Sequence, residues 1–223
     1  MVRGARRPGL RQKKGAIERL YTQAPEHSVV ICVDEMGPQA VKSYRGQRLV
    51  RPAAPRAQRA KQQADYGRRD VAGFVFGALQ PTTGEVFTHT YERRTMGNFA
   101  DFLERLEAWV PQAFERVYVV LDNLAAHRSA DVLLFNLAYP RWEFVFQPKR
   151  AGYLNLIEPW WKTLKSLALK GRRFEAWGEI EAAVRAATLY WNAHRRPYVW
   201  GRRRRHRVPR RFGFASPPGS CLI

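Results

Sequence analysis

The sequence predicts an α/β fold in which a mixed β-sheet is flanked by helices. Val- and Ile-rich runs alternate with segments of helical periodicity in its second half, which favours parallel strands joined through helices. Two neighbouring apolar runs are separated only by the turn PTTG, which favours an antiparallel hairpin. A hydrophobic share of 45% in 223 residues is enough for one sizeable core.

The first half of the chain predicts strands after one short helix. Residues 16–24 could form that helix, and the run HSVVICVDEM at 27–36 is typical of a buried strand. A weaker strand signal at 44–50 precedes a basic loop broken by prolines. Residues 70–80 and 84–92 then form the predicted hairpin, because apolar and polar residues alternate in the second of them.

The second half alternates between the two periodicities. Helices are predicted at 98–110, 130–140, 156–171 and 175–196, and strands at 116–123 and 142–148. Pro140 stops the second of these helices and Gly171 suits the end of the third. The last helix carries an apolar stripe, formed by Trp177, Ile180, Val184, Ala187 and Trp191.

Charge is the unusual feature of the composition. The net charge is +20, with six Lys/Arg and no acid in residues 1–14 and seven Arg and no acid in residues 201–211. The remaining 26 Lys/Arg face 19 Asp/Glu, so residues 15–200 are also basic, at +7. A nucleic-acid phosphate backbone is the natural partner, through release of counterions. A solvated basic surface or a ribosomal-type RNA binder is the alternative.

This distribution predicts three regions and an intracellular setting. We expect a basic arm over residues 1–27, a catalytic core over 28–200 and a basic tail over 201–223. Cys32 and Cys221 lack metal-ligand spacing and suggest no disulfide framework, so Cys32 is expected in the core of a cytoplasmic protein. No signal-type segment and no run of about 18 apolar residues is present, so we expect no membrane partner.

Three acidic residues stand at the ends of apolar segments. Asp34 and Asp122 end predicted strands, and Glu158 lies in the first turn of a predicted helix, where the helix dipole favours a negative charge. If the two strands are neighbours, the carboxylates converge at one edge of the sheet. Any one of them could be a turn residue or a cap, but three together in a basic chain favour a site for a hard divalent cation.

The segments around these acids resemble the three acidic motifs of DDE transposases. VVICVDEM, VVLDNLAAHRS and GYLNLIEPWWKTLK are most similar to bacterial insertion-sequence members of the mariner-type superfamily. The run D-N-x-x-A-H begins at Asp122, and L-N-x-I-E-x-x-W runs from Leu154 to Trp161. The resemblance covers roughly residues 20–203.

The resemblance implies a ribonuclease H-like core that uses two Mg²⁺ or Mn²⁺ ions. Asp34, Asp122 and Glu158 would be the catalytic residues and the metal ligands. The activity implied is cleavage of DNA at transposon ends and strand transfer into target DNA, by a homodimer on DNA in the bacterial cytoplasm, associated with the nucleoid. The alternatives are a ribonuclease H-like nuclease without strand transfer and a non-catalytic DNA-binding remnant.

The sequence departs from the family pattern in two places. Many members have S-P-x-L-N-P-I-E before the third acid, whereas this chain has RAGYLNLIE, with Leu156 in place of the second proline. The first strand is also preceded by about 28 residues, too few for the helix-turn-helix modules of full-length members. The chain is therefore expected to represent the catalytic portion alone.

Several basic residues are candidate DNA contacts. Lys162 and Lys165 lie one and two turns beyond Glu158 on roughly its face, although a solvated helix face is an equal alternative. His127 could contact DNA or be structural. The full set of candidate contacts is His127, Lys162, Lys165, Arg202, Arg203, Arg204 and Arg205.

Other residues near the acids have predicted supporting roles. Glu35 should point to the opposite face of the strand from Asp34, as a structural acid rather than a ligand. Asn155 is predicted to cap the helix of Glu158. Trp160 and Trp161 are expected to pack in the core or at an edge of the sheet rather than to stack on bases.

Overall fold

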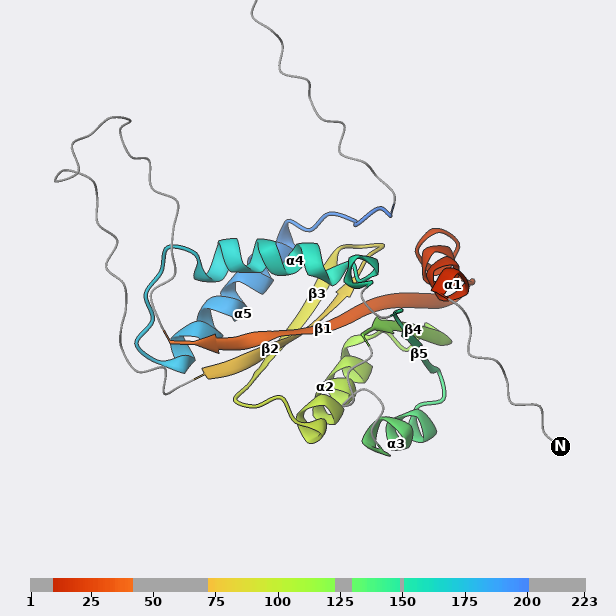
Figure 1. Ribbon diagram of the computed structural model, residues 1–223, viewed down its shortest axis with the longest axis horizontal. Coiled ribbons are helices and arrows are strands. Elements are labelled where there is room, and N and C mark those ends of the chain that lie inside the picture. Colours follow the sequence, from red (N-terminus) through yellow and green to blue (C-terminus); the bar gives the residue numbers. More distant parts are fainter. Residues whose placement is uncertain (1–9, 42–71, 123–129, 149–150, 201–223) are drawn as a thin grey trace, which may run out of the picture.

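A five-stranded mixed sheet forms the centre of the protein (Figure 1). The computed structural model describes residues 10–41, 72–122, 130–148 and 151–200. The strands lie in the order β3-β2-β1-β4-β5, with β1 parallel to β4 and β4 parallel to β5. The two other pairings are antiparallel, so the predicted mixed sheet and hairpin are confirmed. The strands are β1 (Ser28–Ala40), β2 (Ala72–Gln80), β3 (Glu85–Tyr91), β4 (Arg116–Leu121) and β5 (Trp142–Phe146).

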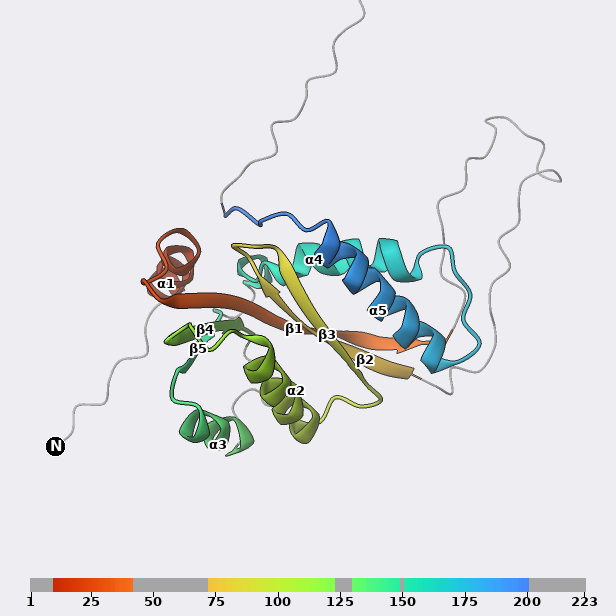
Figure 2. The same cartoon turned by 180° about the vertical axis from the view of Figure 1, so that it is seen from behind.

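Helices cover both faces of this sheet. Helices α4 and α5 lie on one face, and α2 and α3 lie on the other (Figures 1 and 2). The predicted helix at 156–171 is continuous but ends in a π-helical turn, η4, before Gly171 at a φ of 77°. The helices are α1 (Leu10–Thr22), α2 (Met96–Trp109), α3 (Ala130–Ala138), η3 (Gly152–Leu154), α4 (Ile157–Leu164), η4 (Lys165–Leu169) and α5 (Trp177–Ala193).

The alternation of side chains along β1 divides the core into two parts. Cys32 and Met36 belong to the apolar cluster under α4 and α5, whereas Ile31 and Val33 belong to the cluster under α2 and α3. Successive side chains of a strand point to opposite faces. Asp34 therefore lies on the α4 face, and the prediction that Cys32 is a core residue is confirmed.

Strand β1 does not end at Asp34, contrary to the sequence-based prediction. It runs on to Ala40, paired with β2 as far as Ala72, while its last registered pair with β4 is Cys32↔Val120. The pairing with β2 continues through a register shift between Met36 and Gln39. Asp34 thus lies where the parallel neighbour stops and the antiparallel neighbour continues.

The N-terminal helix is longer than predicted and belongs to the packed structure. It begins at Leu10, and its Ile17 side chain is fully buried. The Tyr21 hydroxyl donates to the Leu154 carbonyl at 2.7 Å. Helix α1 is therefore tied to the turn that precedes α4. The predicted strand at 44–50 and Cys221 lie outside the described residues, as do the whole predicted tail over residues 201–223 and residues 1–9 of the predicted arm.

No helix in the described part of the chain is long and apolar enough to cross a membrane.

Glu107 joins the end of α2 to the start of β5. Its carboxylate accepts hydrogen bonds from Arg141 at 2.8 Å, from the Trp142 indole at 2.6 Å and from Gln112 at 3.0 Å. Burial would raise the pKa of this carboxyl group, but these donors outweigh it and hold the pKa below its ordinary value. The ionised form is therefore the one that the fold stabilises.

We expect Glu107→Gln to lower the free energy of unfolding by about 2–3 kcal/mol at pH 7, because three donors lose a charged acceptor. The folded-state pKa lies below the unfolded one, so this stabilisation is present above the ordinary value of 4.5 and is lost as the pH falls further. Urea unfolding at pH 7 and pH 3 would measure both effects. Glu104→Gln, an exposed change on the same helix, is the control. An equal loss at both pH values would contradict the prediction.

Candidate functional site

Asp34 and Asp122 occupy equivalent places on neighbouring parallel strands. Each lies two residues beyond the last registered pair, Cys32↔Val120. Val120 shares the α4-side core with Cys32, so the alternation of side chains places both acids on the α4 face. Asp122 directly follows β4 and is half-buried, like Asp34. The sequence analysis left the adjacency of the two strands as a condition, and the structure pairs them in parallel, so that Asp34 and Asp122 lie at equivalent positions along neighbouring strands.

Asn155 anchors the start of α4 to β1 beside Asp34. Its buried side-chain amide donates to the Val33 carbonyl at 2.9 Å, across 122 positions of sequence. Asn155 was predicted to cap α4, but the N-cap residue is Leu156. The Asn155 side-chain oxygen still accepts a long 3.5 Å hydrogen bond from the Ile157 N–H. Its main contribution is a tertiary contact to the strand that carries the first acid.

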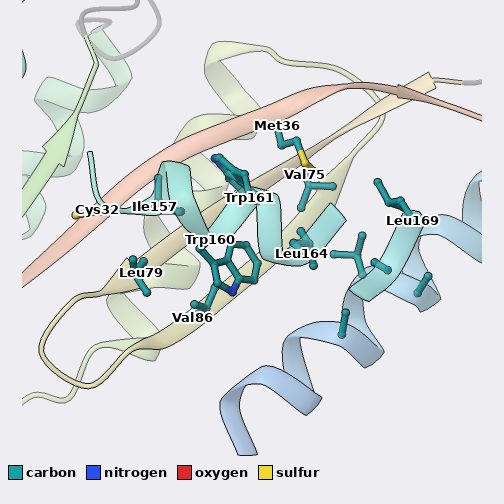
Figure 3. Packing of buried hydrophobic residues seen from close by; sticks show 14 of the residues in the cluster. Cys32, Met36, Val75, Leu79, Val86, Ile157, Trp160, Trp161, Leu164 and Leu169 are labelled. Atoms are coloured by element: carbon teal, nitrogen blue, oxygen red, sulfur yellow. The ribbon is translucent and has the colours of Figure 1, made fainter. Parts of the chain in front are cut away.

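Trp161 makes the second contact between α4 and β1. Its indole N–H donates to Asp34 Oδ2 at 3.0 Å. The ring lies over Gly77, the residue of β2 that pairs with Asp34, and a Cβ atom at Gly77 would lie only 2.5 Å from Trp161 Cη2. Figure 3 shows Trp161 near Met36 of β1, whereas Trp160 lies near Val86 of β3. Both indoles are buried, as predicted, but Trp161 also contacts a candidate metal ligand.

Glu158 enters the site from the first turn of α4. Its side chain is exposed, and a Cβ atom at Gly152 would lie 3.9 Å from Glu158 Oε1, so the carboxylate lies close to the η3 turn. Its negative charge acts on Asp34, so the third acid is within electrostatic reach of the first. Trp161 follows Glu158 by three positions, so one helix presents both residues to the same region.

The pKa of Asp34 shows the electrostatic character of this site. Burial is the largest influence and raises the pKa to about 7. The hydrogen bond from Trp161 opposes this rise, and the negative charges of Glu35 and Glu158 add to it. Glu35, as predicted from strand alternation, belongs to the opposite face of β1. A nearby cation would favour the ionised form of Asp34.

The three acids supply suitable donors for a metal but do not form one compact cluster. Carboxylate oxygens are the ligands that Mg²⁺ and Mn²⁺ prefer, and three elements bring them to one face of the sheet. In the described residues, however, no group of three His, Cys, Asp or Glu side chains is arranged to hold a single ion. The chemistry of the three carboxylates fits a hard divalent cation. The strands and the helix that carry them are in contact, but the carboxylates themselves are not gathered around one point.

The candidate DNA contacts are only partly described. Lys162 is exposed on α4, the helix that carries Glu158, and Lys165 is exposed at the start of η4, which continues it. His127 and the four arginines at 202–205 lie outside the described residues, as does Asn123. The sequence predicted Asn155 only as a helix cap and Trp161 only as a packing residue, and it indicated no role for Gly77. The spacing of Asn155 and Trp161 on either side of Glu158 was the available signal.

Comparison with known proteins identifies the family. Residues 29–181 match the family described as DDE superfamily endonuclease, which covers all three acids. A protein from Shigella sonnei, the uncharacterized 39 kDa protein of insertion element IS630, is 22% identical over 112 residues. That match covers 50% of this chain and 32% of the relative, so the chain spans about a third of the relative that it matches.

Solved structures of Mos1 transposase have the same fold. A Mos1 paired-end complex with the left transposon end matches with a TM-score of 0.57 at 15% identity, over 86% of this chain and 57% of that one. A mariner Mos1 paired-end complex with Mg matches with a TM-score of 0.58 at 15% identity, over 87% of this chain and 60% of that one. The likeness confirms the ribonuclease H-like fold. The match over residues 29–181 shows that this chain belongs to the DDE superfamily endonuclease family.

Proposed function

We propose that this chain is the catalytic domain of a transposase that cuts DNA at transposon ends and transfers the cut strand to target DNA. The observation that carries the proposal is the convergence of three acidic motifs on one face of the sheet. Asp34 and Asp122 follow the same registered pair of parallel strands, and two hydrogen bonds hold the helix of Glu158 against β1. The family match over these motifs supports the same reaction class.

Asp34, Asp122 and Glu158 are the proposed ligands of two divalent ions, Mg²⁺ or Mn²⁺. Such ions, when bound, activate a water or a DNA 3′-hydroxyl and stabilise the leaving oxygen of the phosphodiester. Mos1 complexes with Mn and with Mg give a precedent for both metals. The charges that raise the pKa of Asp34 also favour binding of a cation.

The chain itself orients the carboxylates and binds the DNA backbone. Trp161 holds one oxygen of Asp34, and the first turn of α4 presents Glu158 at its positive end. Lys162 and Lys165 extend from the same helix toward solvent, where they would bind phosphates on either side of the cleaved bond. No covalent protein intermediate is needed, because water or a DNA hydroxyl is the nucleophile.

The proposed partner is DNA, bound by a homodimer that holds two transposon ends. The net charge of +20 favours a phosphate backbone, and the similar Mos1 structures are paired-end complexes. His127 and Arg202–Arg205 are proposed as further DNA contacts. The bacterial cytoplasm, at the nucleoid, is the proposed place of action.

Alanine at Asp34, Asp122 or Glu158 is expected to abolish metal-dependent cleavage and joining. The loss should exceed the roughly 10–100-fold that replacing a neighbour of a metal ligand costs, because a ligand itself is removed. The assay is a gel with labelled duplex DNA that carries the inverted repeat flanking the reading frame, a target plasmid and Mn²⁺. Glu143→Ala, an exposed acid on β5, is the matched control.

The products of this assay separate the alternatives. Joined products from the wild-type protein support a transposase, whereas cleavage without joining would indicate a nuclease that lacks strand transfer. Cleavage that persists in all three alanine variants would refute the assignment of the site.

Replacing both Lys162 and Lys165 by alanine should weaken DNA binding to all sequences alike. The slope of log affinity against log salt should fall by about 1 for each phosphate that the variant no longer neutralises. Fluorescence anisotropy with a labelled duplex at several salt concentrations measures this slope. Arg116→Ala, exposed at the opposite end of β4 from Asp122, should leave the slope almost unchanged. Equal effects of the two changes would argue for a general charge effect.

A further inference from the structure

Trp161 and Gly77 form a support for the Asp34 side chain. We propose that Trp161 is a positioning residue whose indole N–H fixes the orientation of Asp34 for metal binding, and that Gly77 provides the space for the indole. This inference rests on the proposed function, because it concerns a carboxylate of the proposed site. It assigns a specific role to two residues outside the three acids.

The hydrogen bond satisfies the geometric requirement for such a role. The Trp161 indole nitrogen lies 3.0 Å from Asp34 Oδ2, and the indole itself is buried. An indole N–H can only donate, so it fixes one carboxylate oxygen as an acceptor. Donors of this kind orient ligand side chains and restrict their rotation before the metal binds.

Gly77 determines where the indole can lie. It pairs with Asp34 across the β1–β2 ladder, and its missing side chain leaves room for the Trp161 ring. A Cβ atom would come within 2.5 Å of Trp161 Cη2 and within 3.2 Å of Ile157 Cδ1. Any larger residue at position 77 would therefore push the Trp161 indole away from β2 and from Asp34. The added side chain would do so through contact with the ring carbons, without contact to the Asp34 carboxylate or the indole N–H.

The neighbouring tryptophan supplies a matched comparison. Trp160 is also buried on α4, but its indole nitrogen has no hydrogen-bond partner among the described residues. A change to phenylalanine removes the N–H and leaves an aromatic ring at either position. Both variants lose packing, but only Trp161→Phe removes a donor to Asp34. Gly73 is the matched control for Gly77, because a Cβ atom at Gly73 would meet Trp177 rather than Trp161.

We expect Trp161→Phe to weaken Mn²⁺ binding roughly 10–100-fold, with Trp160→Phe close to wild type. Gly77→Ala should weaken binding in the same direction, and Gly73→Ala should not. Electron paramagnetic resonance of free Mn²⁺ during titration measures the affinity, and thermal unfolding reports the loss of packing separately. If Trp161→Phe does not fold, the comparison of Gly77→Ala with Gly73→Ala gives the answer with the indole still present.

A metal-free measurement tests the hydrogen bond itself. The chain has seven tryptophans, so a ¹H–¹⁵N spectrum resolves indole N–H signals that the two phenylalanine variants assign. Asp34→Ala should shift the Trp161 signal by removing its acceptor and leave the Trp160 signal in place. An unchanged Trp161 signal would overturn the proposed contact.

The outcomes distinguish this inference from the proposed function. If Asp34→Ala abolishes Mn²⁺ binding while Trp161→Phe and Trp160→Phe bind alike, the positioning role is wrong and the metal site stands. If Asp34→Ala binds Mn²⁺ as the wild type does, the metal site itself is wrong, and the inference is overturned with it.

Discussion

The attachment of α4 to β1 is the constraint on which the candidate site depends. The helix carries Glu158, the strand carries Asp34, and they are far apart in sequence. Asn155 contacts the carbonyl of the residue before Asp34, and Trp161 contacts the Asp34 carboxylate itself. Since both donors are buried, breaking either bond would leave a polar group without a partner in the core, at a cost of about 1–3 kcal/mol. These costs resist any sliding of the helix along the strand.

The same arrangement reduces the electrostatic cost of placing Asp34 near other carboxylates. Asp34 is half-buried and lies near the negative charges of Glu35 and Glu158, and both conditions disfavour its ionised form. The Trp161 donor offsets part of this cost, and a cation would offset more. The site therefore combines a fixed orientation of Asp34 with an electrostatic preference for positive ions.

Much of the fold could be predicted from local patterns. The Val-rich runs, the PTTG turn and the apolar stripe of α5 reflect periodicities that depend on the nearest few residues, so the described strands and helices largely follow them. Strand ends were less predictable: β1 was expected to end at Asp34, but pairing with β2 carries it to Ala40. Hydrogen bonds from a neighbouring strand can override a local signal, and the sequence does not show where that neighbour lies.

The sequence by itself determined the basic character of the chain, the order of its elements and the three acidic motifs that indicate its family. The tertiary structure decided which face of the sheet Asp34 occupies, that Asp122 lies on the adjacent parallel strand, and that Trp161 contacts Asp34 across 127 positions. It also showed why position 77 is a glycine. The physical reason is that charge and periodicity are local properties, whereas a hydrogen bond or a close approach depends on strand register and helix orientation, which the packing of the whole core sets.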